Sequence, residues 1–385
     1  MDYLELYNKY QTPYYVFDIE ELKSRVKYFR KHLPKDTGIV YAVKANTFII
    51  KELEDLVDRF EICSPGEYTI CNELNISGEK MLISGVYKDY KSTNDMINRE
   101  DEIHRFTIES LEQYRLLSRL CKKYKKNIKV QLRLTSGNQF GMSEEDIYYL
   151  VNNQSSNIEI VGIQYFSGTQ KHNLSIIKKE IDYVKEFIDE FESNTKIIIK
   201  EVEYGVGFPV FYFNGSEFDE DNYFKELSDY LKVFKGKKLL VETGRGLAAS
   251  CGSYITKVVD IKKNKIGNYV IVDGGMNHLV YYGQMMAMKV PYFEHLPKKE
   301  NINIDKYNIC GSLCTINDII IKQVELNDLK LGDLLVFKNT GAYSMTDGIA
   351  LLLSRDLPKI IIYKNKKDIL VRDDFKVSSI NCPRY

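Results

Sequence analysis

Short apolar segments alternate with amphipathic segments through the first two-thirds of the chain. The apolar runs have the length of strands, and they lie at residues 38–46, 60–64, 80–84, 105–109, 128–134, 161–166, 201–205 and 239–244. Between several of them apolar residues recur at helical spacing, as in 49–57, 110–124, 143–152, 174–191 and 221–234. Strands and helices alternating in this way predict a (β/α)8 TIM barrel, and an open doubly wound sheet is the competing α/β architecture.

The pattern changes after Cys251. Runs of β-branched residues bounded by Gly, Asn and Asp occupy 254–261, 269–272, 319–324, 333–338 and 359–363, with few amphipathic helices between them. The charged, Asn-containing segment 291–305 is typical of a loop. We therefore expect a barrel over residues 20–251, and a C-terminal, mainly β domain formed by residues 1–19 and 252–385.

Composition narrows the classes of function. The 54 Lys and Arg residues equal the 54 Asp and Glu residues, so the basic excess of a nucleic-acid-binding protein is missing. No apolar run is long enough to span a membrane, and the acidic N-terminus does not resemble a signal peptide. Seven scattered Cys residues and five His residues show no metal-ligand spacing. We expect a cytoplasmic protein with reduced thiols and without a metal.

Polar residues stand where the predicted barrel strands end, which is where active sites of such barrels lie. Lys44 follows the apolar run 39–43. A lysine desolvated in this way can form a Schiff base, although a lysine that merely extends from a strand end to water gives the same pattern. Cys63, Glu67 and Arg133 stand near the ends of other predicted strands, and residues 167–170 follow a further one.

Residues at the ends of the last two predicted barrel strands could bind an anion and a ring nitrogen. Gly205-Val206-Gly207 leaves room for backbone N–H groups to approach an anion, and Arg245 could bind the same anion bidentately. Glu242 could face a protonated pyridine nitrogen. An ordinary glycine turn and an ion pair at a strand end are the structural alternatives.

Five motifs in this order resemble one family over nearly the whole chain. They are Tyr41-Ala42-Val43-Lys44-Ala45-Asn46, the Gly205 loop, Glu242-Thr243-Gly244-Arg245, Gly311-Ser312-Leu313-Cys314 and Gly341-Ala342-Tyr343. The chain resembles the fold-type III pyridoxal-phosphate decarboxylases, which include diaminopimelate, ornithine and carboxynorspermidine decarboxylases. The resemblance implies an alanine-racemase-like barrel, pyridoxal 5′-phosphate as cofactor and a homodimer.

The resemblance also implies a role for individual residues. Lys44 would hold the cofactor as a Schiff base, and Glu242 would pair with the pyridine nitrogen. Cys314, donated by the partner subunit, would protonate the substrate Cα after CO₂ leaves; without the resemblance it would be interpreted as a buried, inert thiol. Glu67 and Arg133 would form a supporting pair near Lys44. The cofactor phosphate would be held by Thr169, Gly205, Gly207, Arg245 and Tyr343.

The sequence departs from the family at four positions. Phe166 stands where the family usually stacks a His on the cofactor ring, and Thr243 replaces a Pro. Thr315 follows Cys314 where the family has an acid for a distal amine, and Tyr281 stands where diaminopimelate decarboxylases place an Arg for a distal carboxylate. A missing charge partner rejects a charged substrate.

The substrate is therefore predicted to have a neutral or conjugated distal end, and a carrier protein is one conjugate. The candidate substrate-binding residues are Thr315, Tyr281, Asn277 and His278. His278 has a structural role as its alternative. Decarboxylation of an L- or D-amino acid is the predicted reaction. The rival hypotheses are diaminopimelate decarboxylase proper, an amino-acid racemase, and a non-catalytic homologue that binds the cofactor.

Overall fold

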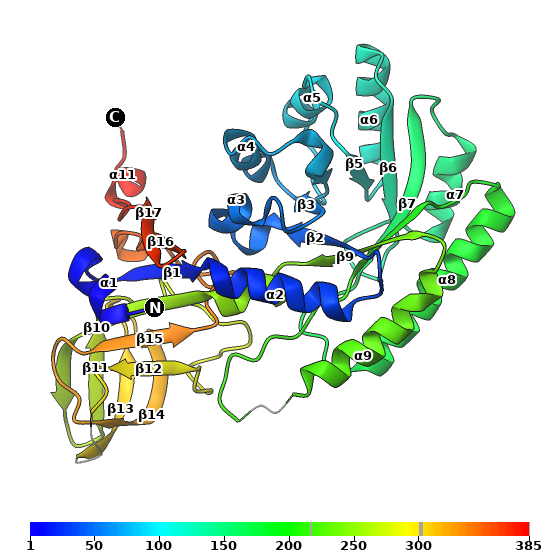
Figure 1. Cartoon of the computed structure of the whole chain (residues 1–385). Helices are drawn as coiled ribbons and strands as arrows, with labels where there is room; N and C mark the ends of the chain where they lie inside the picture. Colours follow the sequence, from blue (N-terminus) through cyan, green and yellow to red (C-terminus); the bar gives the residue numbers. More distant parts are fainter. Residues whose placement is uncertain (216–217, 300–302, 385) are drawn as a thin grey trace. The chain divides into compact units, whose positions relative to one another are not determined.

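The computed structural model describes residues 1–215, 218–299 and 303–384, and the chain forms two compact units (Figure 1). One unit comprises Arg25–Pro209 and Phe218–Gly246. The other comprises Met1–Ser24, Val210–Glu217 and Leu247–Tyr385. The second unit thus includes a short segment, 210–217, that lies within the predicted barrel range in the sequence.

The first unit is a closed parallel barrel, which confirms the predicted fold class. Its strands are β2 (Gly38–Ala42), β3 (Arg59–Ile62), β4 (Met81–Ile83), β5 (Arg105–Ile108), β6 (Ile128–Arg133), β7 (Ile158–Phe166), β8 (Glu201–Gly205) and β9 (Lys238–Thr243). β9 pairs with β2 and closes the ring. Since all eight run parallel, their carboxyl ends, and the residues that follow them, meet at one end of the barrel.

A helix precedes β2, and a helix follows each of these strands (Figure 1). They are α2 (Ile19–His32), α3 (Ile50–Leu53), α4 (Pro65–Glu73), α5 (Tyr90–Asn98), α6 (Leu111–Tyr124), α7 (Glu144–Asn152), α8 (Leu174–Thr195), α9 (Glu220–Leu231) and α10 (Arg245–Ala248). Side chains such as Ser64, Ser110 and Ser143 accept hydrogen bonds from first-turn N–H groups and so fix where helices begin. The helix predicted over 49–57 was wrong in length, because only Ile50–Leu53 forms an α-helix after a 3₁₀ turn at Thr47–Ile49.

The second unit contains a nine-stranded mixed sheet. Its strands are β1 (Tyr14–Asp18), β10 (Gly252–Lys263), β11 (Asn268–Val272), β12 (Phe293–Leu296), β13 (Ile304–Cys310), β14 (Ile319–Asn327), β15 (Leu334–Lys338), β16 (Lys359–Lys364) and β17 (Lys367–Arg372). β1 pairs antiparallel with β10 and parallel with β16. The N-terminal residues are thereby part of this sheet.

The loop predicted over 291–305 was wrong in part. β12 lies inside it and pairs with β15, and β13 begins at Ile304. All four residues of β12 are half-buried, so the segment lacks the alternation by which a strand is recognised in sequence. Residues 300–302 of the predicted loop lie outside the described part of the chain.

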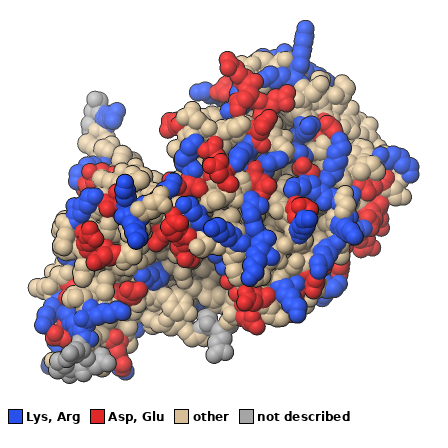
Figure 2. All heavy atoms as spheres, in the orientation of Figure 1, with Lys and Arg blue, Asp and Glu red and all other residues tan. Residues whose placement is uncertain are grey.

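Charges of both signs are interspersed over the face drawn in Figure 2, without a broad patch of one sign. No helix among residues 1–215, 218–299 and 303–384 has the length and hydropathy to cross a bilayer. All seven Cys residues are free thiols.

Candidate active site

Lys44 lies at the carboxyl end of β2, in a 3₁₀ turn over Val43–Ala45. Its Nζ donates a hydrogen bond to Glu61 Oε2 at 2.5 Å and lies 3.9 Å from Glu242 Oε1. Glu61 pairs in register with Ala42, which brings its carboxylate beside the lysine. The Lys44 side chain is 38% exposed, whereas the Glu61 and Glu242 side chains are 3% and 5% exposed. Buried carboxylates therefore hold the lysine, which is not isolated in an apolar environment as its sequence context suggested.

The two carboxylates have different titration behaviour. Burial, and then the negative charge of Glu61, raise the pKa of Glu242 to about 7. Burial also acts to raise the pKa of Glu61, but the adjacent Lys44 outweighs burial and holds that pKa below its usual value. Glu61 is accordingly ionised at neutral pH. Gln164 on β7 donates to Glu242 Oε2 at 3.1 Å and so fixes the carboxylate in the barrel interior.

Glu67 and Arg133, expected to act as a pair, have separate partners. Arg133 Nη1 donates to Glu109 Oε2 at 2.9 Å, and both side chains are buried. Glu67 Oε2 accepts from the backbone N–H of Cys63 at 2.7 Å, and Cys63 Sγ lies 3.5 Å from Lys44 Nζ. Glu67 thus fixes the loop beside Lys44, while Glu109 neutralises Arg133.

Residues 205–207, at the carboxyl end of β8, pack tightly against the carboxyl end of β7 and the residues that follow it. A Cβ on Gly205 would lie 2.1 Å from Cδ2 of Phe166, so the aromatic ring rests against this backbone. Gly207 has a φ of 66°, and a Cβ there would lie 2.2 Å from the carbonyl oxygen of Gly168 and 3.1 Å from Cα of Thr169. Thr169, the glycine turn and Arg245 follow the adjacent strands β7, β8 and β9 in turn. The predicted phosphate-binding residues of this unit therefore share one end of the barrel.

Cys314 lies in the loop between β13 and β14 of the second unit, and its side chain is exposed. Asp318 fixes this loop: Oδ2 accepts from Leu313 N–H and Oδ1 from Met276 N–H, each at 2.8 Å. A Cβ on Gly311 would lie 2.2 Å from Asp318 Oδ2. The interpretation of Cys314 as a buried thiol is thus wrong, because a rigid loop presents it to solvent.

The tentative substrate-binding residues of the same unit differ in their contacts. The ring nitrogens of His278 lie within hydrogen-bonding distance of Tyr254 Oη (3.1 Å) and the carbonyl oxygen of Asp356 (2.9 Å), and the ring is buried. Burial lowers the pKa of His278 to about 4. The hydroxyl of Tyr281 donates to the Lys338 carbonyl at 2.7 Å. These contacts count against direct substrate binding by either residue and favour the structural role considered for His278.

Three further predicted residues of this unit have other environments. Asn277 is 1% exposed, and neither amide atom has a hydrogen-bond partner among the described residues. Thr315 is half-buried, and its hydroxyl accepts from Asn317 N–H at 3.3 Å. Tyr343 has a φ of 64° and stands at a turn, where its carbonyl accepts from the next turn's N–H groups.

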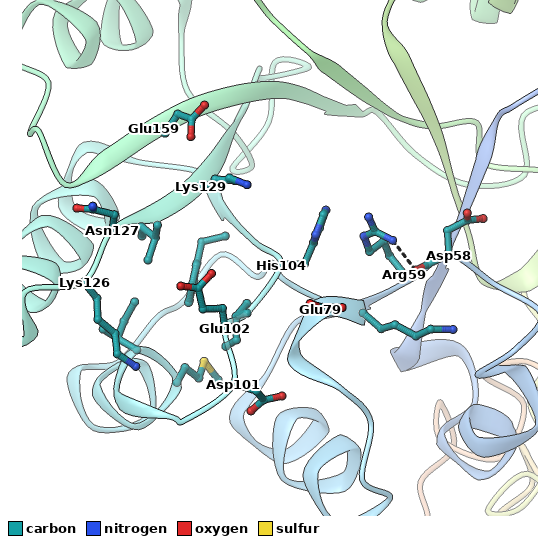
Figure 3. Close-up of a pocket in the computed structure, with 16 residues that line it drawn as sticks. Asp58, Arg59, Glu79, Asp101, Glu102, His104, Lys126, Asn127, Lys129 and Glu159 are labelled. Carbon is teal, nitrogen blue, oxygen red and sulfur yellow. Dashed lines mark hydrogen bonds between the residues drawn. The ribbon is translucent and has the colours of Figure 1, made fainter.

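A cavity of about 540 Å³ lies at the opposite end of the barrel, at the N-terminal ends of β3, β5 and β6 (Figure 3). Arg59, His104 and Lys129 line it. Burial, followed by the positive charges of Arg59, Arg105 and Lys129, lowers the pKa of His104 to about 3. The cavity is separate from the Lys44 site, because the two occupy opposite strand ends.

Sequence reasoning missed several residues of the site, and Glu61 is the most important. A charged residue inside the apolar strand Phe60-Glu61-Ile62 was the available signal, because a buried charge needs a partner. Lys88 was also missed. Its Nζ donates to the carbonyls of Ser84 and Gly85, and burial lowers its pKa to about 8. The described residues contain no group of His, Cys, Asp and Glu that could hold a metal.

Comparison with known proteins identifies relatives that match most of the chain. A family model described as pyridoxal-dependent decarboxylase, C-terminal sheet domain, matches residues 14–341. The chain is 26% identical to the L-glutamyl-[BtrI acyl-carrier protein] decarboxylase of Niallia circulans, over 95% of this chain and 92% of that protein. It is 28% identical to the diaminopimelate decarboxylase of Aquifex aeolicus, over 88% and 84% of the respective chains.

Solved structures show the same fold. The diaminopimelate decarboxylase of Helicobacter pylori, complexed with L-lysine, superposes with a TM-score of 0.85 at 21% identity, over 98% of each chain. That of Methanocaldococcus jannaschii superposes with a TM-score of 0.85 at 24% identity, over 99% of this chain and 94% of the other. With the family model covering most of its length, this chain belongs to the pyridoxal-dependent amino-acid decarboxylases of the ornithine, diaminopimelate and arginine decarboxylase family.

Proposed function

We propose that this protein removes the α-carboxylate of an amino acid whose distal end is neutral or conjugated, with pyridoxal phosphate held at Lys44. The observation that carries the proposal is the position of Lys44, whose Nζ contacts Glu61 at 2.5 Å and lies 3.9 Å from Glu242. An amine held by carboxylates at the catalytic end of a barrel is suited to bind an aldehyde covalently.

The residues present fit pyridoxal phosphate. The turn at Gly205 and Gly207 leaves no room for a side chain, Arg245 follows the next strand, and backbone N–H groups in such a glycine turn are suited to hold an anion. Glu242 is buried and half-ionised near pH 7, as suits a partner for a ring nitrogen. Phe166 supplies an apolar aromatic surface beside Gly205. Pyridoxal phosphate, when bound there, supplies the electron sink for the electron pair that CO₂ leaves behind.

Each protein residue has one task in the proposed reaction. Glu61 accepts a hydrogen bond from Lys44 and can take up the proton that the lysine must lose to become a nucleophile. Glu242, when ionised, holds the proton of the ring nitrogen. Cys314, on the loop fixed by Asp318, returns a proton to the substrate Cα. We propose, from the family resemblance, that the Cys314 used at each site comes from a second copy of the chain, in a cytoplasmic homodimer.

Thr315 and Tyr281, which stand where the family has charged groups for the distal end of the substrate, support a substrate without a distal charge. Thr315 has no charge to pair with a distal amine, and the hydroxyl of Tyr281 is engaged by Lys338. A charged group desolvated without a partner costs several kcal/mol, which disfavours free diaminopimelate or ornithine. The relative from Niallia circulans is named for a glutamyl group on an acyl-carrier protein, and a carrier-linked substrate is the conjugate we favour.

The reaction is tested by adding pyridoxal phosphate to the purified protein and recording its absorbance spectrum, then assaying CO₂ release. Lys44→Ala should abolish both the covalent spectrum and the release of CO₂. Lys232→Ala, at an exposed lysine paired with Asp229, is the matched control and should change neither. Covalent binding without CO₂ release would contradict decarboxylation. Inverted chirality of the recovered amino acid would then identify a racemase, and unchanged amino acids would identify a non-catalytic protein.

The substrate class is tested by comparing kcat/KM for free meso-diaminopimelate with that for glutamate conjugated through its side-chain carboxyl to a small thiol or to an acyl-carrier protein. We expect the conjugates to be preferred by about 100-fold or more, because the free diacid brings an unpaired charge. Efficient turnover of free meso-diaminopimelate would overturn the substrate proposal and leave the reaction proposal intact.

A further inference from the structure

Two buried side chains behind the carboxylate of Glu242 have incomplete hydrogen bonding. Gln164 on β7 and Glu203 on β8 are register partners on adjacent strands, and they are 1% and 0% exposed. Both take part in hydrogen bonds inside the barrel. Gln164 Nε2 donates to Glu242 Oε2 at 3.1 Å, and Glu203 Oε2 accepts from Gln131 Nε2 at 2.9 Å.

The remaining oxygen of each side chain is an acceptor without a donor. Gln164 Oε1 and Glu203 Oε1 are buried, and neither has a hydrogen-bond partner within the described part of the chain. A buried acceptor without a partner costs about 1–3 kcal/mol. One proton satisfies both atoms at once, since a protonated carboxyl is a donor whereas a carboxylate is an acceptor only.

The surroundings of Glu203 favour the protonated form of its carboxyl group. The pKa of Glu203 is raised well above its ordinary value, and burial is the largest cause. The carboxylates of Glu242, Glu61 and Glu201 raise it further, because they repel a negative charge on Glu203. Two cations near these carboxylates are already paired: Arg105 with Glu201 at 3.0 Å, and Lys44 with Glu61 at 2.5 Å. The neighbours from β3, β8 and β9 are thus acidic, and the cation from β5 is already neutralised.

We propose that Glu203 is a positioning residue whose protonated carboxyl donates a hydrogen bond to Gln164 Oε1. This bond decides how the Gln164 amide is oriented. With its oxygen engaged by Glu203, its Nε2 must face Glu242. An ionised Glu203 would compete for the same NH₂ group and would leave Glu242 facing an amide oxygen. The inferred bond stands independently of the proposed function, but its consequence for the cofactor rests on Glu242 as the partner of the ring nitrogen.

The first test measures the proton itself on cofactor-free protein. Infrared difference spectra of wild type against E203Q should contain the carbonyl stretch of a protonated carboxyl at neutral pH. Thermal unfolding over a pH series gives a second readout. Because folding raises the pKa of Glu203, its stabilising contribution is present at low pH and is lost as pH rises through the folded-state pKa. E203Q keeps a neutral donor, so the difference between its unfolding temperature and that of wild type should shift in favour of E203Q as pH rises.

The second test measures the effect on Glu242. E203L removes the donor, and the affinity for pyridoxal phosphate should fall about tenfold or more, because Gln164 no longer supports a charged partner. E203Q can donate to Gln164 and accept from Gln131, so it should restore most of the affinity. Equal losses in E203Q and E203L, without a carboxyl band in wild type, would show that Glu203 acts as a carboxylate and would overturn the proposal. If E203L does not fold, the infrared and unfolding data on E203Q decide alone.

Failure of the proposed function is distinguishable from failure of this inference. A protein that releases no CO₂, or binds no cofactor, would refute the function while the infrared band and the pH series still report on Glu203.

Discussion

Lys44 owes its position to a carboxylate that stands seventeen residues later in the chain. The hydrogen bond from Lys44 to Glu61 is charge-assisted, and its acceptor, Glu61, is buried. It therefore contributes more free energy than an ion pair at the surface does. We predict that E61Q lowers kcat by about 10- to 100-fold, since a hydrogen bond between charged groups contributes ~1.5–3 kcal/mol. E61D, with the same charge on a shorter side chain, should lose less. Single-turnover measurements of the covalent step with Lys44 check this prediction, and equal activity of E61Q and wild type would contradict it.

The affinity for the cofactor should depend on pH through Glu242. Its pKa is raised to about 7, so the carboxylate is mostly protonated below that pH and cannot hold the proton of the ring nitrogen. We predict that the dissociation constant of pyridoxal phosphate rises about tenfold for each pH unit below 7. Fluorescence titrations from pH 5.5 to 8.5 measure it. E242Q is the control, because it retains the titration of the cofactor phosphate but should lose the pH dependence that Glu242 causes. Identical pH dependence of the dissociation constant in the two proteins would show that Glu242 is not its source.

At the scale of elements, the glycine turn after β8 depends on both its backbone conformation and its packing. Gly207 has a φ of 66° and no room for a Cβ. We predict that G207A weakens cofactor binding by about tenfold or more and lowers thermal stability, since strain of this kind costs ~1–3 kcal/mol. G236A is the matched control: Gly236 also has positive φ (94°), but open space surrounds its Cβ position. Equal losses of affinity in both variants would show that general destabilisation, not the packing of the turn after β8, is responsible.

The eight barrel strands could be predicted from the sequence because each is a short segment in which apolar residues are continuous, as in 39–43, or alternate with polar ones, as in 128–133. β12 and β17 could not. β12 is half-buried throughout, and β17 has mostly exposed residues, so neither has the alternation that identifies a strand. The contact between Lys44 and Glu61 depends on the register of β2 with β3, which no local pattern encodes. Arg133 was noticed, but its partner Glu109 comes from the neighbouring strand end and was missed for the same reason.

At the scale of the whole molecule, the residues proposed to act on the substrate belong to two different units, and this leads to a prediction about assembly. Lys44 belongs to the barrel unit, whereas Cys314 is exposed on a loop of the sheet unit. If Cys314 is donated by a second copy of the chain, K44A and C314A chains are each inactive, but a mixed dimer contains one site with both residues intact. Random mixing should then recover about a quarter of wild-type activity, because half of the dimers are mixed and each has one working site. The measurement is CO₂ release after the two variants are co-refolded or co-expressed, with either variant mixed with itself as the control. Absence of any recovery, when mass spectrometry shows that mixed dimers have formed, would place Cys314 and Lys44 of one chain in the same site.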